Sequence, residues 1–294
     1  MESKGKRSYK IIYTADLHGN ISQYVKLFAK ALSEQADAVI IGGDITPKDK
    51  ERRTPKLQKA FLKNELIPLI KRTKESFKKT RKDVKIFLIM GNDDFKDNRS
   101  FLIRNESAGF KEVHNKIASL TKDYDLIGYS FVPLSPFIYK DWEKLDSRYI
   151  DEKEYRPYFI TEGFCSKDGE LVKKVIQTKN RKDTIEKDLE RLFRKKRMKK
   201  TILMTHAPPY NSNLDLNSTR EHVGSKGVRQ IIETKIPEIS LHGHIHETVK
   251  KSGKYKEKIG FTTCFSPGNN PESKNLAVIM FDMYDPSSSR REII

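Results

Sequence analysis

The chain of 294 residues is long enough to bury a substantial hydrophobic core, which favours one large domain or two small ones. Its two cysteines, Cys165 and Cys264, form no C-x-x-C pair, so neither a disulfide framework nor a zinc ribbon is supported, and a reducing, cytoplasmic setting is expected. The charged first ten residues and the lack of any apolar run of about 18 residues predict no signal peptide and no membrane span.

Basic residues outnumber acidic ones by 58 to 40, which gives a formal net charge of +18. This charge raises the local concentration of anions and makes nucleic acid a candidate partner, although it identifies none. The basic clusters Lys71–Lys82 and Arg194–Lys200 are interpreted as solvated helix faces, because few aromatic side chains are interleaved with them. No membrane partner is expected, and the oligomeric state is not predicted.

Short apolar runs alternate with amphipathic stretches along the chain, which is the pattern of α/β folds. Buried strands are predicted at Tyr9–Ala15, Ala38–Ile41, Val84–Met90 and Thr201–Thr205.

Helical spacing of apolar residues predicts helices between most of these strands. The first runs from Ile21 to Leu32, and the second begins near Leu57 until Pro68 kinks or ends it. A third helix is predicted from the capping-box spacing of Asp183 and Glu186, and it leads into the strand at residue 201.

The second half of the chain is richer in β pattern, so the sheet is expected to be mixed. Further strands are predicted at Leu126–Val132, Ser240–His242, Lys254–Phe265 and Ala277–Asp282. Residues 140 to 180 show no clear period and are predicted to form an insertion in a single domain that spans residues 1–294.

Aspartate, asparagine and histidine side chains follow the predicted strands. Asp16 and His18 come after the first strand, Asp44 after the second, Asn92 and Asp93 after the third, and His206 after the fourth. Ligands of open α/β sheets bind at the carboxyl ends of the strands, so these side chains are expected at one edge. A fifth segment adds His244 and His246, which would face the same way if that segment were extended.

Taken singly, each of these residues is more often a helix cap, a turn former or a structural histidine than a metal ligand. Their joint occurrence at successive strand ends indicates a site. Seven nitrogen and oxygen ligands are too many for one tetrahedral ion and fit two divalent ions that share a carboxylate. Manganese is expected, and iron, zinc, cobalt, nickel or magnesium are alternatives, because such ligands discriminate little among these metals.

The five segments ADLHGN, GGDI, GNDD, THAPP and LHGHIH resemble the motifs D-x-H, G-D, G-N-H-[DE], H and G-H-x-H of the calcineurin-like metallophosphoesterase superfamily. The resemblance extends from about residue 9 to residue 283. It implies a four-layered α/β/β/α sandwich with two mixed β-sheets. The implied metal ligands are Asp16, His18 and His246 for one ion, Asn92, His206 and His244 for the other, and Asp44 for both.

The resemblance also implies an activity. This is hydrolysis of phosphodiester or phosphomonoester bonds by in-line attack of a metal-bridging hydroxide, with Asp44, Asn92, Asp93 and His206 as catalytic residues. Asp93 departs from the family pattern, which has a histidine credited with acting on the leaving group. An unperturbed aspartate is ionised at neutral pH and would repel a developing alkoxide, so Asp93 is not expected simply to inherit that role.

Two other functions stay open. A nuclease or nucleotide phosphodiesterase of the same superfamily is mildly favoured by the net charge. A non-catalytic scaffold would be expected to lose metal ligands, whereas all seven positions are filled here. Three further histidines have weaker context. His242 either touches the ligands or packs in the core, and His114 is given no role. His222 either lies over the pocket and contacts phosphate, helped by a helix start near Ser225 or Lys226 that would bind an anion, or precedes an ordinary helix cap.

Overall fold

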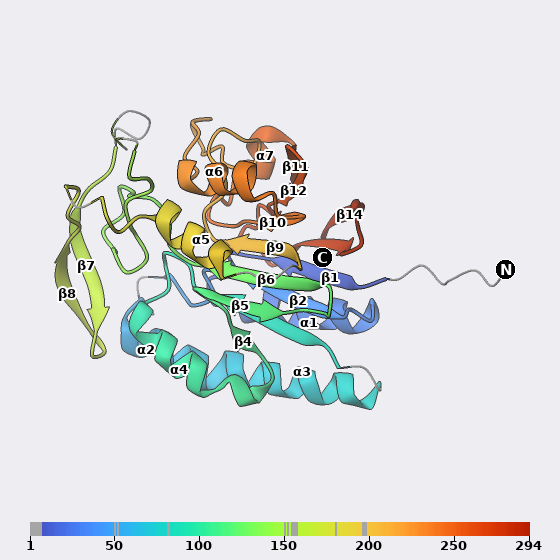
Figure 1. Cartoon of the computed structure of the whole chain (residues 1–294). Helices are drawn as coiled ribbons and strands as arrows, with labels where there is room; N and C mark the ends of the chain where they lie inside the picture. Colours follow the sequence, from blue (N-terminus) through green and yellow to red (C-terminus); the bar gives the residue numbers. More distant parts are fainter. Residues whose placement is uncertain are drawn as a thin grey trace.

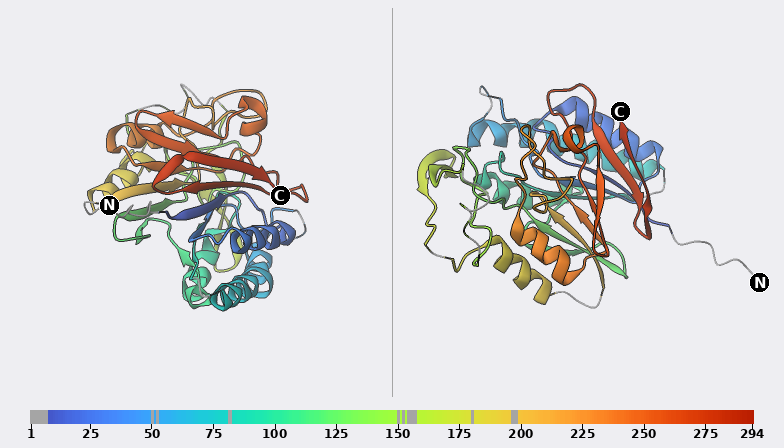
Figure 2. Two further views of the ribbon diagram at one scale, coloured as in Figure 1. Left: turned by 90° about the vertical axis from the view of Figure 1, so that its right-hand side faces the viewer. Right: turned by 90° about the horizontal axis from the view of Figure 1, so that it is seen from above.

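The computed structural model describes residues 8–49, 51, 53–80, 83–149, 151, 153, 158–179, 181–195 and 199–294. Two six-stranded mixed sheets pack against each other in the middle of the molecule, and helices cover the outer face of each sheet (Figure 1, Figure 2). The predicted four-layered α/β/β/α sandwich with two mixed β-sheets is therefore confirmed.

The first sheet contains three of the four strands predicted from buried apolar runs. Its order is β14 (Asp285–Ile293), β13 (Ala277–Asp282), β1 (Lys10–Thr14), β2 (Ala38–Gly42), β3 (Lys85–Ile89) and β4 (Lys111–Glu112). Strands β1 to β4 are parallel to one another, whereas β13 runs antiparallel to both of its neighbours, β1 and β14. In the register, Thr14 lies opposite Ile41 and Gly42 lies opposite Ile89, so β1, β2 and β3 end at the same edge.

The second sheet has the order β11 (Lys256–Ile259), β12 (Thr262–Phe265), β10 (Ile239–Leu241), β9 (Lys200–Thr205), β6 (Tyr124–Tyr129) and β5 (Lys116–Ser119). The four central strands are parallel to one another. The β-rich stretch predicted as Lys254–Phe265 divides into β11 and β12 at Gly260, which has a φ of +58°. Strands β9 and β10 therefore deliver the segments that follow them to one edge of this sheet.

The central strands are apolar on both faces because each face is covered. Along β1, Ile11 and Tyr13 belong to the core between the two sheets, whereas Ile12 belongs to the core under the helices. Such two-sided burial explains why these strands appear in the sequence as continuous apolar runs rather than as alternating ones.

The helices of the first outer layer are α1 (Ile21–Ser33), α2 (Pro55–Phe61), α3 (Ile67–Lys79) and α4 (Arg99–Arg104), with short turns η2 (Lys96–Asn98) and η3 (Glu106–Ala108). Pro68 does not end the second predicted helix. A π-helical turn, η1 (Leu62–Leu66), precedes it, and α3 continues for eleven residues beyond Pro68. The wider turn accommodates a residue that cannot donate a backbone hydrogen bond.

The second outer layer is formed by α5 (Ile185–Arg194), α6 (Lys226–Lys235) and α7 (Thr248–Ser252). The predicted capping box at Asp183 and Glu186 is wrong in detail, because the N-cap of α5 is Thr184, whose hydroxyl accepts from the backbone N–H of Lys187 at 3.2 Å. Glu186 instead accepts a hydrogen bond from the hydroxyl of Ser147 at 2.7 Å.

The segment from residue 140 to residue 180 contributes a separate hairpin, β7 (Glu162–Lys167) and β8 (Glu170–Val175), at one end of the molecule (Figure 1). Its first residues are packed more tightly, since the side chain of Trp142 is fully buried in the hydrophobic core. Several positions of this segment lie outside the described part of the chain, so its assignment as an insertion stays a prediction.

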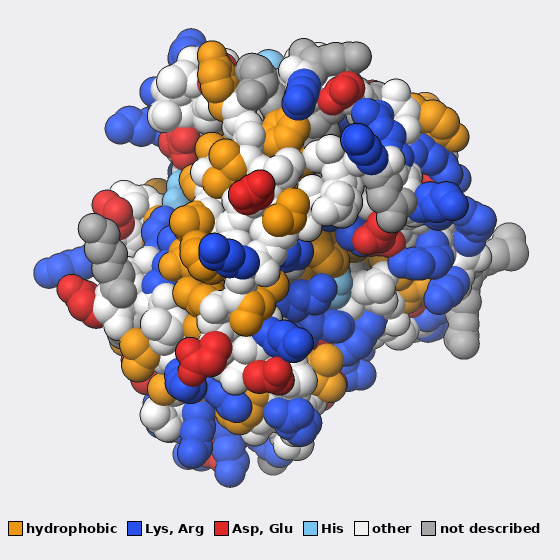
Figure 3. Space-filling view, turned by 90° about the vertical axis from the view of Figure 1, so that its left-hand side faces the viewer, with side chains coloured by type: hydrophobic (Ala, Val, Ile, Leu, Met, Phe, Trp, Pro, Cys, Tyr) orange, Lys and Arg blue, Asp and Glu red, His pale blue; other side chains and the backbone are white. Residues whose placement is uncertain are grey.

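Basic side chains are spread over the face of the molecule that Figure 3 shows and gather in places there. Lys71, Lys78 and Lys79 are exposed on α3, as the interpretation of a solvated helix face requires. Residues 81–82 and 196–198 of the two basic clusters lie outside the described residues. Among the helices that the structure describes, none combines the length and the apolar character needed to cross a membrane.

Candidate metal centre

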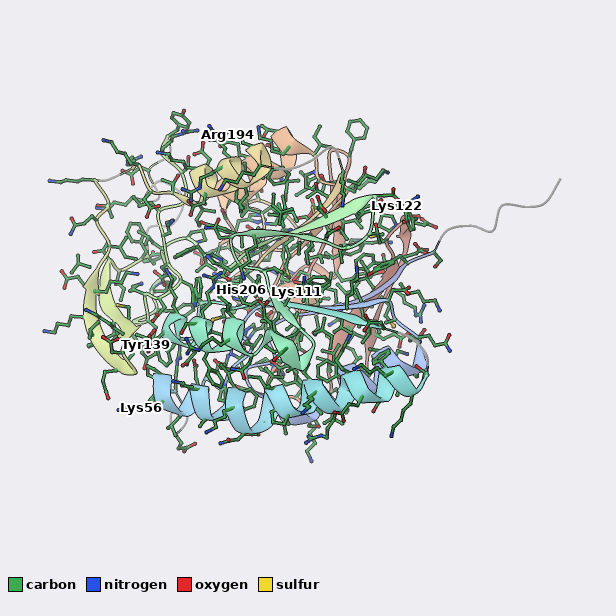
Figure 4. The ribbon with its side chains drawn as sticks, turned by 60° about the horizontal axis from the view of Figure 1, so that its bottom comes forward. Lys56, Lys111, Lys122, Tyr139, Arg194 and His206 are labelled. Atoms are coloured by element: carbon green, nitrogen blue, oxygen red, sulfur yellow. The ribbon has the colours of Figure 1, made fainter. Side chains whose placement is uncertain are left out.

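The seven predicted ligands lie together where the carboxyl ends of the central strands of both sheets meet. The loops after β1, β2 and β3 come from the first sheet, and those after β9 and β10 come from the second. Figure 4 labels His206, which lies in the middle of the molecule, and Tyr139, which lies toward the β7–β8 hairpin. The site is thus built between the two sheets.

Four of the side chains form one compact group. Ligand atoms of Asp16, His18, Asp44 and His246 all lie within 4.8 Å of one another. The Nε2 atoms of His18 and His246 face each other at 3.0 Å, and Nε2 of His18 is 3.5 Å from Oδ2 of Asp44. Two imidazole nitrogens and carboxylate oxygens thus converge on one point.

The remaining three side chains form a second group on the other side of Asp44. Oδ1 of Asn92 lies 2.7 Å from Nδ1 of His244 and 3.0 Å from Nε2 of His206. The same Nε2 atom of His206 is 3.4 Å from Oδ2 of Asp44. One oxygen of Asp44 therefore lies between the two groups.

The backbone is bent sharply at four of these residues. Asp16, His18, Asp44 and His244 have φ values of +59°, +44°, +51° and +71°, a region that residues other than glycine seldom adopt. Backbone hydrogen bonds fix the bends, from the N–H of His18 to the carbonyl of Asp44 at 2.8 Å and from the N–H of His244 to Oδ1 of Asp16 at 2.9 Å.

The bend at His244 means that the segment is not extended, so the condition under which His244 and His246 would face the same way is not met. Only Ile239–Leu241 is a strand, and the chain turns after it. His244 consequently contacts Asn92 in one group, whereas His246 contacts His18 in the other.

Two glycines permit the close approach of the loops. A Cβ atom on Gly91 would lie 2.3 Å from Oδ1 of Asp44, and one on Gly43 would lie 2.4 Å from Nδ1 of His206. Both distances are far below van der Waals contact, so any larger residue at either position would displace a ligand side chain.

The residues present suit a pair of divalent cations. Oδ2 of Asp16 is buried and has no hydrogen-bond partner within the described residues, although buried polar atoms are usually satisfied. All donors are oxygen or imidazole nitrogen, which bind manganese, iron, zinc and similar ions. A cation bound here would compensate a carboxylate oxygen that the described residues leave unpaired.

Electrostatics in the ion-free site is dominated by burial and by Asp44. Burial raises the pKa of Asp16 to about 7, and the charge of Asp44 adds to the shift. Burial lowers the pKa of His246 to about 4 and that of His18 well below its usual value. Burial also acts to lower the pKa of His206, but the carboxylate of Asp44 outweighs it and raises that pKa to about 9. Protonated His206 thus supplies, beside Asp44, the positive charge that a bound cation would supply.

Asp93 lies at the edge of this centre and is joined to a residue that the sequence did not indicate. Its backbone N–H donates to Oδ1 of Asp44 at 2.8 Å, and its carboxylate pairs with the guanidinium of Arg53. The Arg53 guanidinium also stacks on Tyr139, with Cζ 4.3 Å from the ring centroid. Burial and the charge of Asp44 raise the pKa of Asp93 to about 6, with Arg53 opposing the shift, so Asp93 is mostly ionised at neutral pH.

The turn after β3 is held by Asp94 and Gln58. The carboxylate of Asp94 accepts from the backbone N–H groups of Gly91 at 2.8 Å and of Thr46 at 2.8 Å. The amide of Gln58 donates to the carbonyls of Pro47 and Asp93 at 2.9 and 2.8 Å. These bonds join the loop that carries Asp44 to the loop that carries Asn92.

Two of the three further histidines are held by residues outside the two groups of candidate ligands. His114 is buried against aromatic rings and accepts from the N–H of Ser130 at 2.9 Å. Nδ1 of His222 contacts Asp215 at 2.7 Å. The third, His242, is buried next to the hydroxyl of Thr205 at 2.9 Å.

The N-terminus of α6 is not available as the anion site suggested for this region. Its N-cap is Ser225, and the carboxylate of Asp146 accepts from the N–H groups of Lys226 and Gly227 at 2.7 and 3.1 Å. Asp146 therefore takes the place that a phosphate would fill.

A cavity of about 1070 Å³ opens beside the centre. Its lining includes candidate ligand side chains of both groups, the cations Lys48 and Arg53, and the segment from Pro136 to Tyr139. Phe137 and Ile138 in this segment are about half exposed. The cavity thus has a polar side, formed by candidate ligands and cations, and an apolar side, formed by the Pro136–Tyr139 segment.

The model of the calcineurin-like phosphoesterase family matches residues 9–248, which is most of the chain. The chain belongs to this family. The resemblance drawn from the five motifs is therefore confirmed. Among curated proteins, the chain is 37% identical over 95 residues to the uncharacterized protein MJ1162 of Methanocaldococcus jannaschii, a stretch that covers 29% of this chain and 40% of that protein.

Solved structures show the same fold at low sequence identity. One crystal structure superposes with a TM-score of 0.62 at 16% identity, covering 98% of this chain and 99% of the other. The protein TT1561 of Thermus thermophilus gives a TM-score of 0.57 at 15% identity with the same coverage. A protein of Danio rerio described as a dimetal phosphatase gives 0.52 at 10% identity, covering 94% of this chain and 95% of the other.

Proposed function

We propose that this phosphoesterase is a dinuclear metal-dependent phosphohydrolase that acts on small phosphodiesters or phosphomonoesters. The observation that carries the proposal is the position of Asp44, whose Oδ2 atom is 3.5 Å from Nε2 of His18 in one group and 3.4 Å from Nε2 of His206 in the other. The proposed ligands are Asp16, His18 and His246 for one ion, Asn92, His206 and His244 for the second, and Asp44 for both.

Two divalent cations, when bound, lower the pKa of water and withdraw charge from phosphate oxygens. The contribution of the chain is to preorganise the groups around them. The bends at Asp16, His18 and Asp44 fix the ligands before substrate arrives, which saves reorganisation during the reaction.

Arg53 is the side chain best placed to contact the substrate phosphate. It lines the cavity, and its guanidinium is held between the Asp93 carboxylate and the ring of Tyr139. A guanidinium presents several N–H donors in a fixed plane and suits phosphate oxygens. In this proposal Asp93 is a positioning residue for Arg53, and it does not act as the general acid that the family histidine is credited with being.

The size and the lining of the cavity favour a substrate that carries an organic group beside the phosphate. At about 1070 Å³ it exceeds what a phosphate needs, and the Pro136–Tyr139 wall offers apolar and aromatic contact. A nucleoside or a similar flat group would pack against such a wall. Nucleotide phosphodiesters are therefore among the substrates to be screened first.

The direct test is metal analysis together with ester hydrolysis. We expect the purified full chain to bind two manganese ions and to hydrolyse bis-p-nitrophenyl phosphate and p-nitrophenyl phosphate only with divalent ions present. A protein that binds the ions but cleaves neither ester with any divalent ion would contradict the enzymatic proposal and favour a scaffold.

Asp44→Asn tests the bridging assignment. We expect turnover to fall to background and manganese content to drop, because a neutral amide cannot compensate two neighbouring cations. Asp168→Asn is the matched control, since Asp168 is exposed in the β7–β8 turn with a φ of +54° that asparagine tolerates. Full activity of Asp44→Asn would rule out Asp44 as the bridging ligand.

A further inference from the structure

A second cavity, of about 600 Å³, is lined by the two ends of the segment from residue 131 to residue 145, whereas the middle of this segment lines the first cavity. It shares no lining residue with the cavity of the metal centre. Its cationic lining residues are Lys96, Arg99, Lys116, Lys144, Lys174 and Arg191. Figure 3 shows basic side chains gathered toward the lower right of one face of the molecule.

The acidic groups in and around this cavity are already paired. Lys144 contacts Asp183 at 2.7 Å and Asp188 at 2.6 Å, and Arg191 contacts Asp188 at 2.6 Å.

The third acidic lining residue, Glu143, pairs with Lys140 at 2.6 Å, and both side chains are fully buried. Outside the lining, Glu112 pairs with Arg99 at 2.9 Å and with Lys116 at 3.4 Å. The carboxylates near the cavity thus neutralise four of its six cations.

Lys96 and Lys174 are the two cations left over. The Lys96 ammonium lies over the rings of Phe131 and Trp142, 4.8 and 5.2 Å from their centroids. The Lys174 ammonium donates to the backbone carbonyl of Lys140 at 2.6 Å. Neither ammonium forms an ion pair with a carboxylate of the described residues. Burial together with the charges of Lys174 and Lys144 lowers the pKa of Lys96, and the carboxylate of Asp141 only partly opposes this shift.

Holding the ammonium groups of Lys96 and Lys174 near other cations costs free energy unless an anion binds among them. Like charges brought together in a partly buried space repel one another, and proteins retain such features mainly where function requires them. A concave cationic site also concentrates anions, and 600 Å³ lies in the usual range of small-ligand sites.

We propose that this second cavity binds a small polyanion, a molecule that carries two or more phosphate groups, with Lys96 and Lys174 as its principal contacts. A small molecule is favoured over nucleic acid because the aromatic rings below Lys96 are covered. Trp142 is fully buried and Phe131 is 9% exposed, so bases could not stack on them. The proposal does not depend on the proposed catalytic activity.

The test is isothermal titration of tripolyphosphate into the full chain freed of divalent ions, at fixed ionic strength. We expect saturable binding of one tripolyphosphate per chain. Affinity should fall about tenfold or more in Lys96→Gln/Lys174→Gln, the loss typical of charge-assisted contacts. The matched control is Lys111→Gln/Lys122→Gln, which removes the same charge at two exposed positions labelled in Figure 4 and should change affinity less than about twofold.

Several results would overturn the proposal. Equal loss in both double variants would indicate attraction by net charge alone, and loss in Arg53→Gln instead would place the anion in the first cavity. Saturable binding of a single-stranded oligonucleotide with no binding of tripolyphosphate would indicate a nucleic-acid surface. Thermal melting of each variant checks folding, and Lys96→Gln alone is expected to melt no lower than the parent because it relieves repulsion.

Discussion

The ion pair between Arg53 and Asp93 changes how the replacement of the family histidine by Asp93 is interpreted. In the sequence, Asp93 replaces a histidine and appears as the loss of a group that could assist the leaving group. In the structure it holds a cation, Arg53, against the cavity beside the metal centre. The local charge is therefore closer to that of a protonated histidine than the substitution alone suggests.

A double-mutant cycle separates the two roles of Asp93. We expect Arg53→Gln to lower kcat/KM by about 10- to 100-fold, the value of a charge-assisted hydrogen bond to phosphate. Asp93→Asn should lower it less in the parent and far less again in the Arg53→Gln background, because Asp93 acts mainly through Arg53. A small remainder is expected, since Oδ2 of Asp93 also lies 3.7 Å from Nδ1 of His18. Arg53→Lys, which keeps the charge but not the planar donor geometry, should recover part of the rate.

The contrary outcome of that cycle is specific. If Asp93 acts directly on the leaving group, Asp93→Asn should remain costly in the Arg53→Gln background. Its effect should also be larger for alkyl esters than for p-nitrophenyl esters, because poor leaving groups depend more on protonation.

If the proposed ligands are correct, protons and metal ions would compete for the same centre, which gives a prediction on pH. In the ion-free protein the pKa of His206 is about 9 and that of Asp16 is about 7, so both hold protons at or below neutral pH. Metal binding must displace these protons, so the apparent affinity for manganese should rise as the pH increases from 6 to 9, by about tenfold per pH unit for each proton displaced.

Calorimetry in buffers of different ionisation enthalpy would count the protons released. We expect release at pH 7 and little release above pH 9. An affinity that does not change across this range would contradict the protonated state assigned to His206.

At the scale of secondary structure, the strands were the most predictable elements. The runs at β1, β2, β3 and β9 are buried on both faces, and continuous apolar runs signal that directly. The continuation through Pro68 could not be predicted, because it depends on a π turn that tertiary packing stabilises. The β7–β8 hairpin is partly exposed along its length, so it lacks the apolar signal.

The cap of α5 offers a test of local structure. Thr184 is fully buried and its hydroxyl accepts from the N–H of Lys187, whereas the side chain of Asp183 is 70% exposed and pairs with Lys144. We expect Thr184→Ala to lower the free energy of unfolding by about 1 kcal/mol, and Thr184→Ser to lower it less. Asp183→Ala should cost about 0.5 kcal/mol or less, because exposed ion pairs contribute little.

Urea denaturation of the three variants would measure these changes. A larger loss for Asp183→Ala than for Thr184→Ala would show that Asp183 is the effective cap. Thr184→Ser is the control for the hydroxyl itself, since it removes only the methyl group.

At the scale of the whole molecule, the order of the loops made the candidate ligands predictable and the pocket around them unpredictable. Asp16, Asp44 and Asn92 each follow a strand, and parallel strands end at the same edge, so their proximity follows from topology. Arg53, Tyr139 and Asp93 meet only because distant segments pack together. No local pattern in the sequence links them.

The centre also joins the two sheets. Candidate ligands on the loops after β1, β2 and β3 come from one sheet, and those after β9 and β10 come from the other. Ions bound by both sets would hold the sheets together, and they can bind only the folded chain. Manganese at about a thousand times its dissociation constant should then stabilise the protein by about 4 kcal/mol.

For a chain of this length that stabilisation corresponds to a rise in Tm on the order of 8 °C, which a chelator should reverse. Differential scanning calorimetry with manganese and then with excess chelator would measure it. Asp44→Asn should lose most of the rise because its site no longer compensates two cations, whereas Asp168→Asn should keep it. A Tm that is the same with and without manganese, in protein shown to contain the metal, would mean that the ions do not couple the two sheets.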